Sequence, residues 1–175
     1  MQLSPERCVL LKEHYRCHPR IIEFCNKKFY HDELAIMTQD DGEDNVLKVI
    51  MTREGNHCRG RYNQREIDVI LNDILYNEPV IEDVGIISPY RNQVDAMQKQ
   101  INNVEIDTVH KFQGREKDFI IISTVDNQIT DFVDNANMLN VAVSRAKKRL
   151  CLVTNGNKHN KNGNINDLIS YISDK

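Results

Sequence analysis

The stretch from Ile106 to Val125 reads IDTVHKFQGREKDFIIISTV. Within it, Phe119–Ile122 is continuously apolar and rich in β-branched residues, which is typical of a strand buried on both faces of a sheet. Before this strand, residues 108–117 gather a hydroxyl, an imidazole, an amide, a glycine and alternating charges. A plain connection between strands requires none of this chemistry, although Gly114 could simply supply a positive φ in a solvated loop. The stretch predicts a buried strand and leaves both interpretations of the loop open.

Buried strands alternate with amphipathic helices along the rest of the chain. Helices are expected from Pro19 to about Tyr30 and at 64–77, 92–101, 136–148 and 165–172, and strands at 7–11, 46–51, 84–87, 104–109, 119–125 and 149–154. This alternation predicts an α/β fold with a mostly parallel sheet covered on both faces. Polar clusters at 88–91, 108–116 and 155–158 directly follow strands, where ligands of such sheets bind.

Composition predicts a single globular domain spanning residues 1–175. Hydrophobic residues make up 40% and charged residues 28% of the chain, and the formal net charge is −3. An acidic chain has no overall attraction to nucleic acid, so any such binding needs a local patch. The five cysteines (Cys8, Cys17, Cys25, Cys58 and Cys151) form no CxxC pair, which favours free thiols in a reducing compartment over disulfides or a zinc site. With no signal peptide and no apolar run of membrane length, we expect an intracellular, cytoplasmic protein without a metal site or a membrane partner.

Four short motifs carry a resemblance to a known family. They are Tyr15-Arg16-Cys17-His18-Pro19, Ser88-Pro89-Tyr90 with Gln93, Thr108–Glu116, and Leu139–Lys147. In this order and spacing they resemble the later motifs of superfamily 1 helicases. The closest match is the branch that contains the nonsense-mediated-decay RNA helicase and related AAA-type DNA helicases. Each motif alone is weak, whereas the ordered set is specific and spans most of the chain.

The resemblance implies half of a two-domain motor. Such helicases bind ATP and Mg²⁺ between two RecA-like domains, the first of which carries the phosphate-binding loop GxxxxGK[ST]. No glycine of this chain precedes a lysine, so that loop is absent, and Ile120–Asp126 is interpreted as a core strand rather than a Walker B motif. The chain is therefore expected to be the second RecA-like domain, a three-layer α/β/α unit of the P-loop NTPase type without its own P-loop. Its partners would be the first domain and single-stranded DNA or RNA, and it would be monomeric.

By resemblance, Arg145 is an arginine finger that reaches the γ-phosphate of ATP, and Arg16 is a second arginine for that phosphate. Tyr15 would stack on the adenine. The residues themselves leave plainer alternatives open: Arg145 as a surface arginine, Arg16 as the ion-pair partner of Glu13 or Glu23, and Tyr15 as a core residue.

The loop at 113–116 would face both ligands. Gln113 and Gly114 are assigned to nucleotide binding, and Glu116 is counted with the two arginines as catalytic. Glu116 could accept a hydrogen bond from the ribose or order the water and metal shell, a choice that the sequence leaves open. Arg115 is expected to pair with Asp118.

Five residues would contact the single strand by resemblance, through hydroxyls and backbone amides that hold phosphates without reading sequence. They are Ser88, Pro89, Tyr90, Thr108 and His110. For His110, a satisfied loop histidine is an alternative. Asn155 and Lys158 are further candidates by position. Asp126-Asn127 departs from the family pattern, which often has an arginine there, and Cys17 replaces a common methionine.

The expected function is that of the C-terminal motor domain of an ATP-dependent helicase moving 5′→3′, inactive as an isolated fragment. The main alternative is a non-enzymatic nucleic-acid-binding or regulatory module of the same fold. A nuclease is disfavoured, because no compact Asp/Glu/Lys cluster is present to hold two metals.

Overall fold

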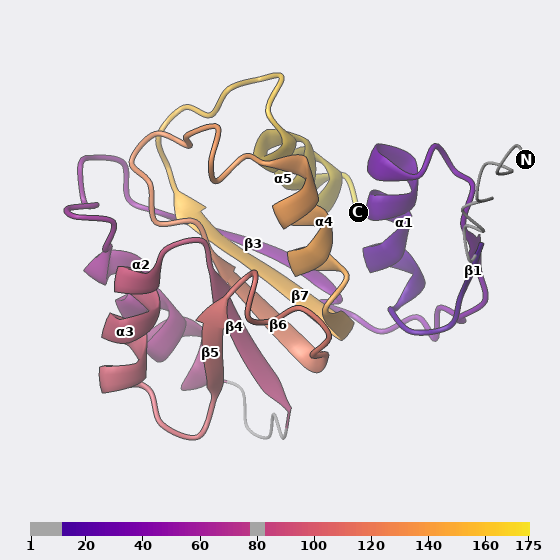
Figure 1. Cartoon of the computed structure of the whole chain (residues 1–175), viewed down its shortest axis with the longest axis horizontal. Coiled ribbons are helices and arrows are strands. Elements are labelled where there is room, and N and C mark those ends of the chain that lie inside the picture. The colour runs from indigo at the N-terminus through magenta and orange to yellow at the C-terminus, as the bar shows by residue number, and fades with distance from the viewer. Residues whose placement is uncertain (1–11, 78–82) are drawn as a thin grey trace, which may run out of the picture.

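A five-stranded sheet forms the centre of the chain, with helices packed on both faces (Figure 1). The computed structural model describes residues 12–77 and 83–175. The strand order is β3-β7-β6-β4-β5, and each adjacent pair is parallel. The strands are β3 Leu47–Thr52, β4 Val84–Ser88, β5 Glu105–Thr108, β6 Lys117–Ser123 and β7 Ala146–Asn155. This confirms the predicted α/β class with a mostly parallel sheet.

Two apolar cores lie on the two faces of the sheet. One face packs against α1 (Pro19–Phe29), α4 (Ala136–Val143) and α5 (Asn164–Ser173), and the other against α2 (Gln64–Val69), η1 (Ile70–Leu75) and α3 (Arg91–Gln100). In β6, Ile120 and Ile122 belong to the first core, while Ile121 belongs to the second. The continuously apolar strand is thus explained by burial on both sides.

The predicted helix at 136–148 is wrong in its second half. Helix α4 ends at Val143, the chain turns at Ser144-Arg145, and β7 begins at Ala146. The turn is fixed by the sheet, because Ala146 pairs with Lys117 and the Lys117 N–H donates to the Arg145 carbonyl at 3.0 Å. Tertiary pairing here overrides the helical propensity of an Ala-Lys-Lys run.

Other differences from the expected elements are smaller. The helix expected at 64–77 changes at Ile70 into a π-helical segment, in which the Tyr76 N–H donates to the Leu71 carbonyl. Two short strands, β1 (Glu13–His14) and β2 (Ala35–Ile36), pair in parallel apart from the main sheet; two-residue strands have no readable periodicity. The strand expected at 7–11 lies outside the described residues.

Residues 109–116 join the end of β5 to the start of β6. Phe112 is fully buried in the same core as Val109, so this connection is anchored on one face of the sheet. Gly85 of β4 makes room for it: a Cβ at Gly85 would lie 2.7 Å from Phe112 Cζ. The connection and the central strand are therefore fitted to each other.

Replacing Gly85 by alanine is expected to lower the free energy of unfolding by about 1–3 kcal/mol, since a well-packed core does not accept extra volume without strain. The added Cβ would also lie 2.8 Å from Lys117 Cγ and 2.9 Å from Ile120 Cδ1. Urea unfolding of the variant measures the loss. In a Phe112→Leu background the same substitution should cost less, because the two residues are in contact. An equal cost in both backgrounds would contradict the proposed fit.

Candidate nucleotide and nucleic-acid site

Three predicted catalytic residues meet near the amino-terminal ends of β6 and β7. Glu116 directly precedes β6, Arg145 directly precedes β7, and Arg16 lies between β1 and α1. Arg16 Nη1 forms an ion pair with Glu116 Oε1 at 2.8 Å. The charges of all three residues act on the thiol of Cys17, although burial is the main cause that raises its pKa to about 12. Residues far apart in sequence thus share one small region.

Two hydrogen bonds hold the Arg16 segment against the turn that carries Arg145. Cys17 Sγ donates to the Ser144 carbonyl at 3.3 Å, and the His18 N–H donates to the Lys147 carbonyl at 2.6 Å. The motif at 15–19 and the motif at 139–147 are therefore in direct contact.

The side chain of Arg145 is half-buried and has only neutral partners. Its Nε donates to the Val141 carbonyl and its Nη2 to Ser144 Oγ, each at 3.3 Å. Among the described residues, no carboxylate forms an ion pair with Arg145, so its charge is available to an anionic ligand.

The plainer alternatives for the neighbouring residues are not what the structure shows. Arg16 pairs with Glu116 rather than with Glu13 or Glu23. Tyr15 is 65% exposed and is therefore not a core residue, and its hydroxyl donates to Glu13 at 2.6 Å. A planar aromatic face is thus presented to solvent beside Arg16.

The loop at 113–116 is largely open to solvent. Gln113 and Gly114 are exposed, and Gly114 has a φ of +82°, as expected for a glycine turn. The expected pair of Arg115 with Asp118 is wrong, because Arg115 Nη1 contacts Glu105 Oε1 at 2.6 Å.

Asp118 is occupied by the basic run that follows Arg145. Its two carboxylate oxygens form ion pairs with Lys147 Nζ and Lys148 Nζ, each at 2.8 Å. The run at 147–149 belongs to β7, whereas the expected helix at 136–148 had included Lys147 and Lys148.

The predicted strand-binding residues lie at the opposite, carboxyl-terminal edge of the sheet. Ser88 and Thr108 end the neighbouring strands β4 and β5 and are register partners. His110 is exposed, and Pro89 and Thr108 are half-buried. Ser88 is fully buried, with no hydrogen-bond partner for its Oγ among the described residues, and Tyr90 is only 8% exposed. The side chains open to a strand in this arrangement are those of Pro89, Thr108 and His110.

The two groups of predicted residues therefore lie at two edges of one sheet rather than together at the carboxyl edge. The connection at 109–116 links them, with His110 near one end and Glu116 at the other. Asn155, suggested as a surface contact, is instead buried, and its Nδ2 donates to the Asn127 carbonyl at 2.9 Å.

Comparison with known proteins agrees with this architecture. A family model described as an AAA domain (AAA_12) matches residues 1–157. The chain belongs to the AAA domain family. It is 27% identical to a protein of Methanocaldococcus jannaschii named an uncharacterized ATP-dependent helicase. The alignment of 195 positions covers 95% of this chain and 29% of that relative. The resemblance to superfamily 1 helicases is thereby confirmed.

A second curated relative and a solved structure are also similar to this AAA domain. A regulator of nonsense transcripts 1 homolog from Neurospora crassa is 28% identical over an alignment of 208 positions, which covers 100% of this chain and 19% of the relative. A solved C-terminal domain of a possible DNA helicase from Lactobacillus plantarum has a TM-score of 0.59 and 18% identity, covering 90% of this chain and 93% of that chain, and supports the fold. The chain spans less than a third of the length of the curated relatives cited here.

The AAA domain also contains a buried polar network that the motifs did not reveal. Glu66 is fully buried at the start of α2 and accepts hydrogen bonds from Ser123 Oγ at 2.6 Å and from the Val125 N–H at 3.0 Å. Burial raises the pKa of Glu66 to about 7. The backbone of Val125 has a φ of +74°, which is unusual for a β-branched residue. Only the helix start was readable from the local sequence, since Asn63 is the N-cap of α2 and its Oδ1 accepts from the Glu66 N–H at 3.3 Å.

Asp126, which stands where the helicase family often has an arginine, has a structural role in this domain. Its carboxylate accepts hydrogen bonds from the Tyr90 hydroxyl at 3.0 Å and from Thr130 Oγ1 at 2.7 Å. Asp126 thus fixes Tyr90 against the loop that follows β6.

Among residues 12–77 and 83–175, no helix is of a length and hydropathy that would cross a bilayer. The same described residues contain no group of three His, Cys, Asp or Glu side chains that could hold a metal ion.

Proposed function

We propose that this AAA domain is the second motor domain of an ATP-dependent helicase that moves along single-stranded DNA or RNA. The observation that carries the proposal is the grouping of Arg16, Glu116 and Arg145, in which three motifs contribute one charge each to a single region. In the proposal these arginines are positioned toward a triphosphate, for which a domain that only binds nucleic acid has no use. The name of the Methanocaldococcus jannaschii relative, an uncharacterized ATP-dependent helicase, supports the same conclusion.

The residues present fit a nucleoside triphosphate. Arg145 carries a positive charge without a carboxylate partner among the described residues, and Tyr15 offers an exposed ring for the base. ATP and Mg²⁺ would be held mainly by a first RecA-like domain, and the γ-phosphate would be the group that reacts. In the proposal, Arg145 stabilises charge on that phosphate as the arginine finger, and Arg16 contacts it with a planar, bidentate fork.

In the proposal, the ion pair with Glu116 keeps the Arg16 side chain in place until a nucleotide binds and displaces Glu116. The side chains are 44% and 27% exposed. Pairs with this exposure contribute at most about 1 kcal/mol, so a phosphate oxygen can displace Glu116 at little cost. Glu116 would then be free to accept from the ribose or from the water shell, and Gln113 and Gly114 would approach the same ligand.

On the other edge, Thr108, His110 and Pro89 would contact the strand, and Ser88 and Tyr90 would shape this segment from beneath. The connection at 109–116 touches both proposed ligands and is anchored through Phe112. Changes at the nucleotide would therefore be passed to the strand along a short, packed segment. The proposal includes 5′→3′ movement and predicts that the 175-residue chain alone neither hydrolyses ATP appreciably nor unwinds a duplex.

The experiment is ATP hydrolysis by the longer protein with and without single-stranded DNA or RNA, followed by displacement of duplexes with a 5′ or a 3′ single-stranded tail. Stimulated hydrolysis and displacement from the 5′ tail are expected. Strand binding without hydrolysis would instead favour the non-enzymatic module, and displacement only from the 3′ tail would overturn the polarity.

A further inference from the structure

The loop at 53–62, which follows β3 and ends in a tight hairpin turn between Arg59 and Tyr62 (hereafter the hairpin), concentrates positive charge that no motif uses. Residues 53–65 include Arg53, Arg59, Arg61 and Arg65 and one exposed acidic residue, Glu54, in a chain whose net charge is −3. The hairpin closes through the bridge of Arg59 with Tyr62. A local basic patch of this kind is what an acidic chain needs in order to bind nucleic acid.

These arginines differ from most others of the domain in having no acidic partner. Each of four arginines elsewhere in the fold forms an ion pair with a carboxylate: Arg16, Arg20, Arg91 and Arg115. All four arginines of 53–65 are exposed, and none of them is in an ion pair with a described residue. Their charges are therefore not neutralised within the described part of the fold.

The hairpin is held in place by asparagine side chains from three neighbouring segments. Asn127 Oδ1 accepts from the Cys58 N–H at 2.8 Å, Asn157 Oδ1 accepts from the Gly55 N–H at 2.9 Å, and Asn92 Nδ2 donates to the Gly60 carbonyl at 2.8 Å. These asparagines come from the segments after β6 and β7 and from the start of α3, so the hairpin lies at the carboxyl-terminal edge of the sheet. Because its backbone is already ordered, binding a ligand costs little further entropy.

An aromatic pair connects the hairpin with the proposed strand-binding segment. The Arg61 guanidinium lies 5.5 Å from the centre of the Tyr90 ring, and Tyr90 stacks on Phe132 with ring centres 5.4 Å apart. Tyr90 is buried beneath these contacts, whereas Phe132 is 49% exposed. Phe132 is thus an exposed aromatic surface connected through Tyr90 to the cation of Arg61, and bases stack on such rings regardless of sequence.

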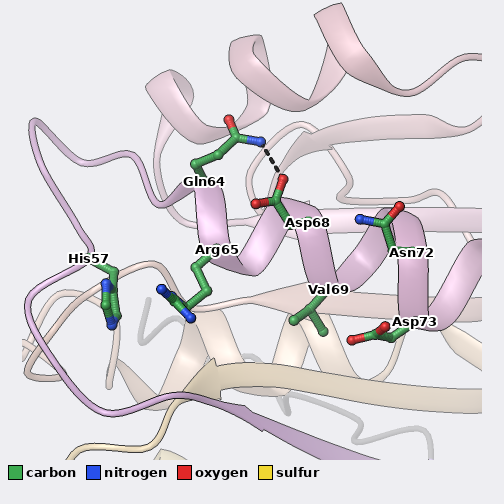
Figure 2. A pocket seen from close by; sticks show the side chains of 7 residues that line it. All are labelled: His57, Gln64, Arg65, Asp68, Val69, Asn72 and Asp73. Carbon is green, nitrogen blue, oxygen red and sulfur yellow. Dashed lines mark hydrogen bonds between the residues drawn. The ribbon is translucent and has the colours of Figure 1, made fainter.

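Figure 2 shows the side of the hairpin that faces helix α2. His57 and Arg65 both extend into an open groove of about 470 Å³ between the hairpin and α2. Asp68 and Asp73 line the groove farther along the helix. A polyanion is therefore expected to approach at the His57 and Arg65 end and to avoid the acidic end.

We propose that the hairpin at 53–62, with Phe132, extends the path of the single strand beyond Pro89 and Thr108. The arginines would hold phosphates and Phe132 would stack on a base. This inference rests on the proposed function and adds to it a second strand-binding surface. Phosphate and base contacts of this kind suit single-stranded DNA and RNA alike.

The test compares the 175-residue chain with the variant Arg53→Gln/Arg59→Gln/Arg61→Gln, using fluorescence anisotropy of labelled single-stranded DNA and RNA over a salt series. The variant should bind at least about tenfold more weakly at low salt, and its dependence of log K on log salt should be shallower by about 2, since each phosphate contact contributes about 0.7 on a single strand. Phe132→Leu should weaken binding about tenfold without changing the slope, because stacking releases no counterions.

A matched control removes the same charge elsewhere. Lys27→Gln/Lys28→Gln/Lys175→Gln alters α1 and the C-terminal end, which lie on the other side of the molecule from the hairpin (Figure 1). Its affinity and slope should stay near those of the unaltered chain, and thermal melting checks that every variant is folded. If the hairpin variant matches this control, the inference is overturned while strand binding by the unaltered chain still supports the proposed function. If the unaltered chain binds no single strand at low salt, both fall.

Discussion

Arg145→Ala is expected to lower the strand-stimulated ATPase activity of the longer protein by about 10³-fold, the effect of an arginine that stabilises the transferring phosphoryl group. The structure gives the physical reason. Arg145 is half-buried, its hydrogen bonds go to the Val141 carbonyl and to Ser144 Oγ, and no described carboxylate competes for its charge. Since the contact matters mainly in the transition state, turnover should fall far more than the KM for ATP rises.

Arg115→Ala is the matched control for this measurement. Arg115 is an exposed arginine near the same edge of the sheet, but it is paired with Glu105 at 2.6 Å. Its removal should leave turnover close to that of the unaltered protein. An Arg145→Ala protein that hydrolyses ATP as fast as the Arg115→Ala protein would remove the proposed role of Arg145 and favour a nucleic-acid-binding module.

Glu66→Ala is expected to lower the free energy of unfolding by roughly 3–5 kcal/mol, because it leaves buried donors without an acceptor. The donors are the Val125 N–H and the Ser123 hydroxyl, whereas the Thr124 hydroxyl keeps Thr154 Oγ1 as a partner at 2.9 Å. The Val125 N–H belongs to a residue with a φ of +74°, so the same change also removes a contact that holds an unfavourable backbone conformation. Urea unfolding at neutral pH measures the loss. A loss below about 1 kcal/mol would show that water or rearranged partners satisfy these donors.

The pH dependence of stability separates the effect of the titrating carboxyl group of Glu66 from the effect of a side chain that only has the same shape. Burial raises its pKa in the folded state from an ordinary 4.5 to about 7, so the folded protein binds the proton more tightly than the unfolded chain does. The free energy of unfolding therefore falls as pH rises between these values, by about 3 kcal/mol from this group alone. Glu66→Gln should remove this fall, since its amide does not titrate in this range. Urea unfolding of both proteins at about pH 5 and about pH 8 gives the difference, and parallel pH profiles would contradict the assignment.

Local patterns in the sequence determined most of the secondary structure. Strand β6 was readable because burial on both faces requires an unbroken apolar run, and α1 because Pro19 opens an apolar stripe of helical period. The end of α4 was not readable in this way. Residues 144–148 favour a helix locally, and only the pairing of Ala146 with Lys117 makes them a turn and a strand.

The sequence by itself also determined which residue types and motifs are present, and hence the helicase family. Only the tertiary structure decided how they are combined: Arg16 with Glu116, Arg61 with Tyr90, and Glu66 beneath Val125. It also separated the predicted nucleotide residues from the predicted strand residues, at opposite edges of the sheet. The physical reason is that periodicity and propensity act between residues a few positions apart, whereas ion pairs, ring contacts and buried hydrogen bonds depend on which distant segments the sheet order brings together.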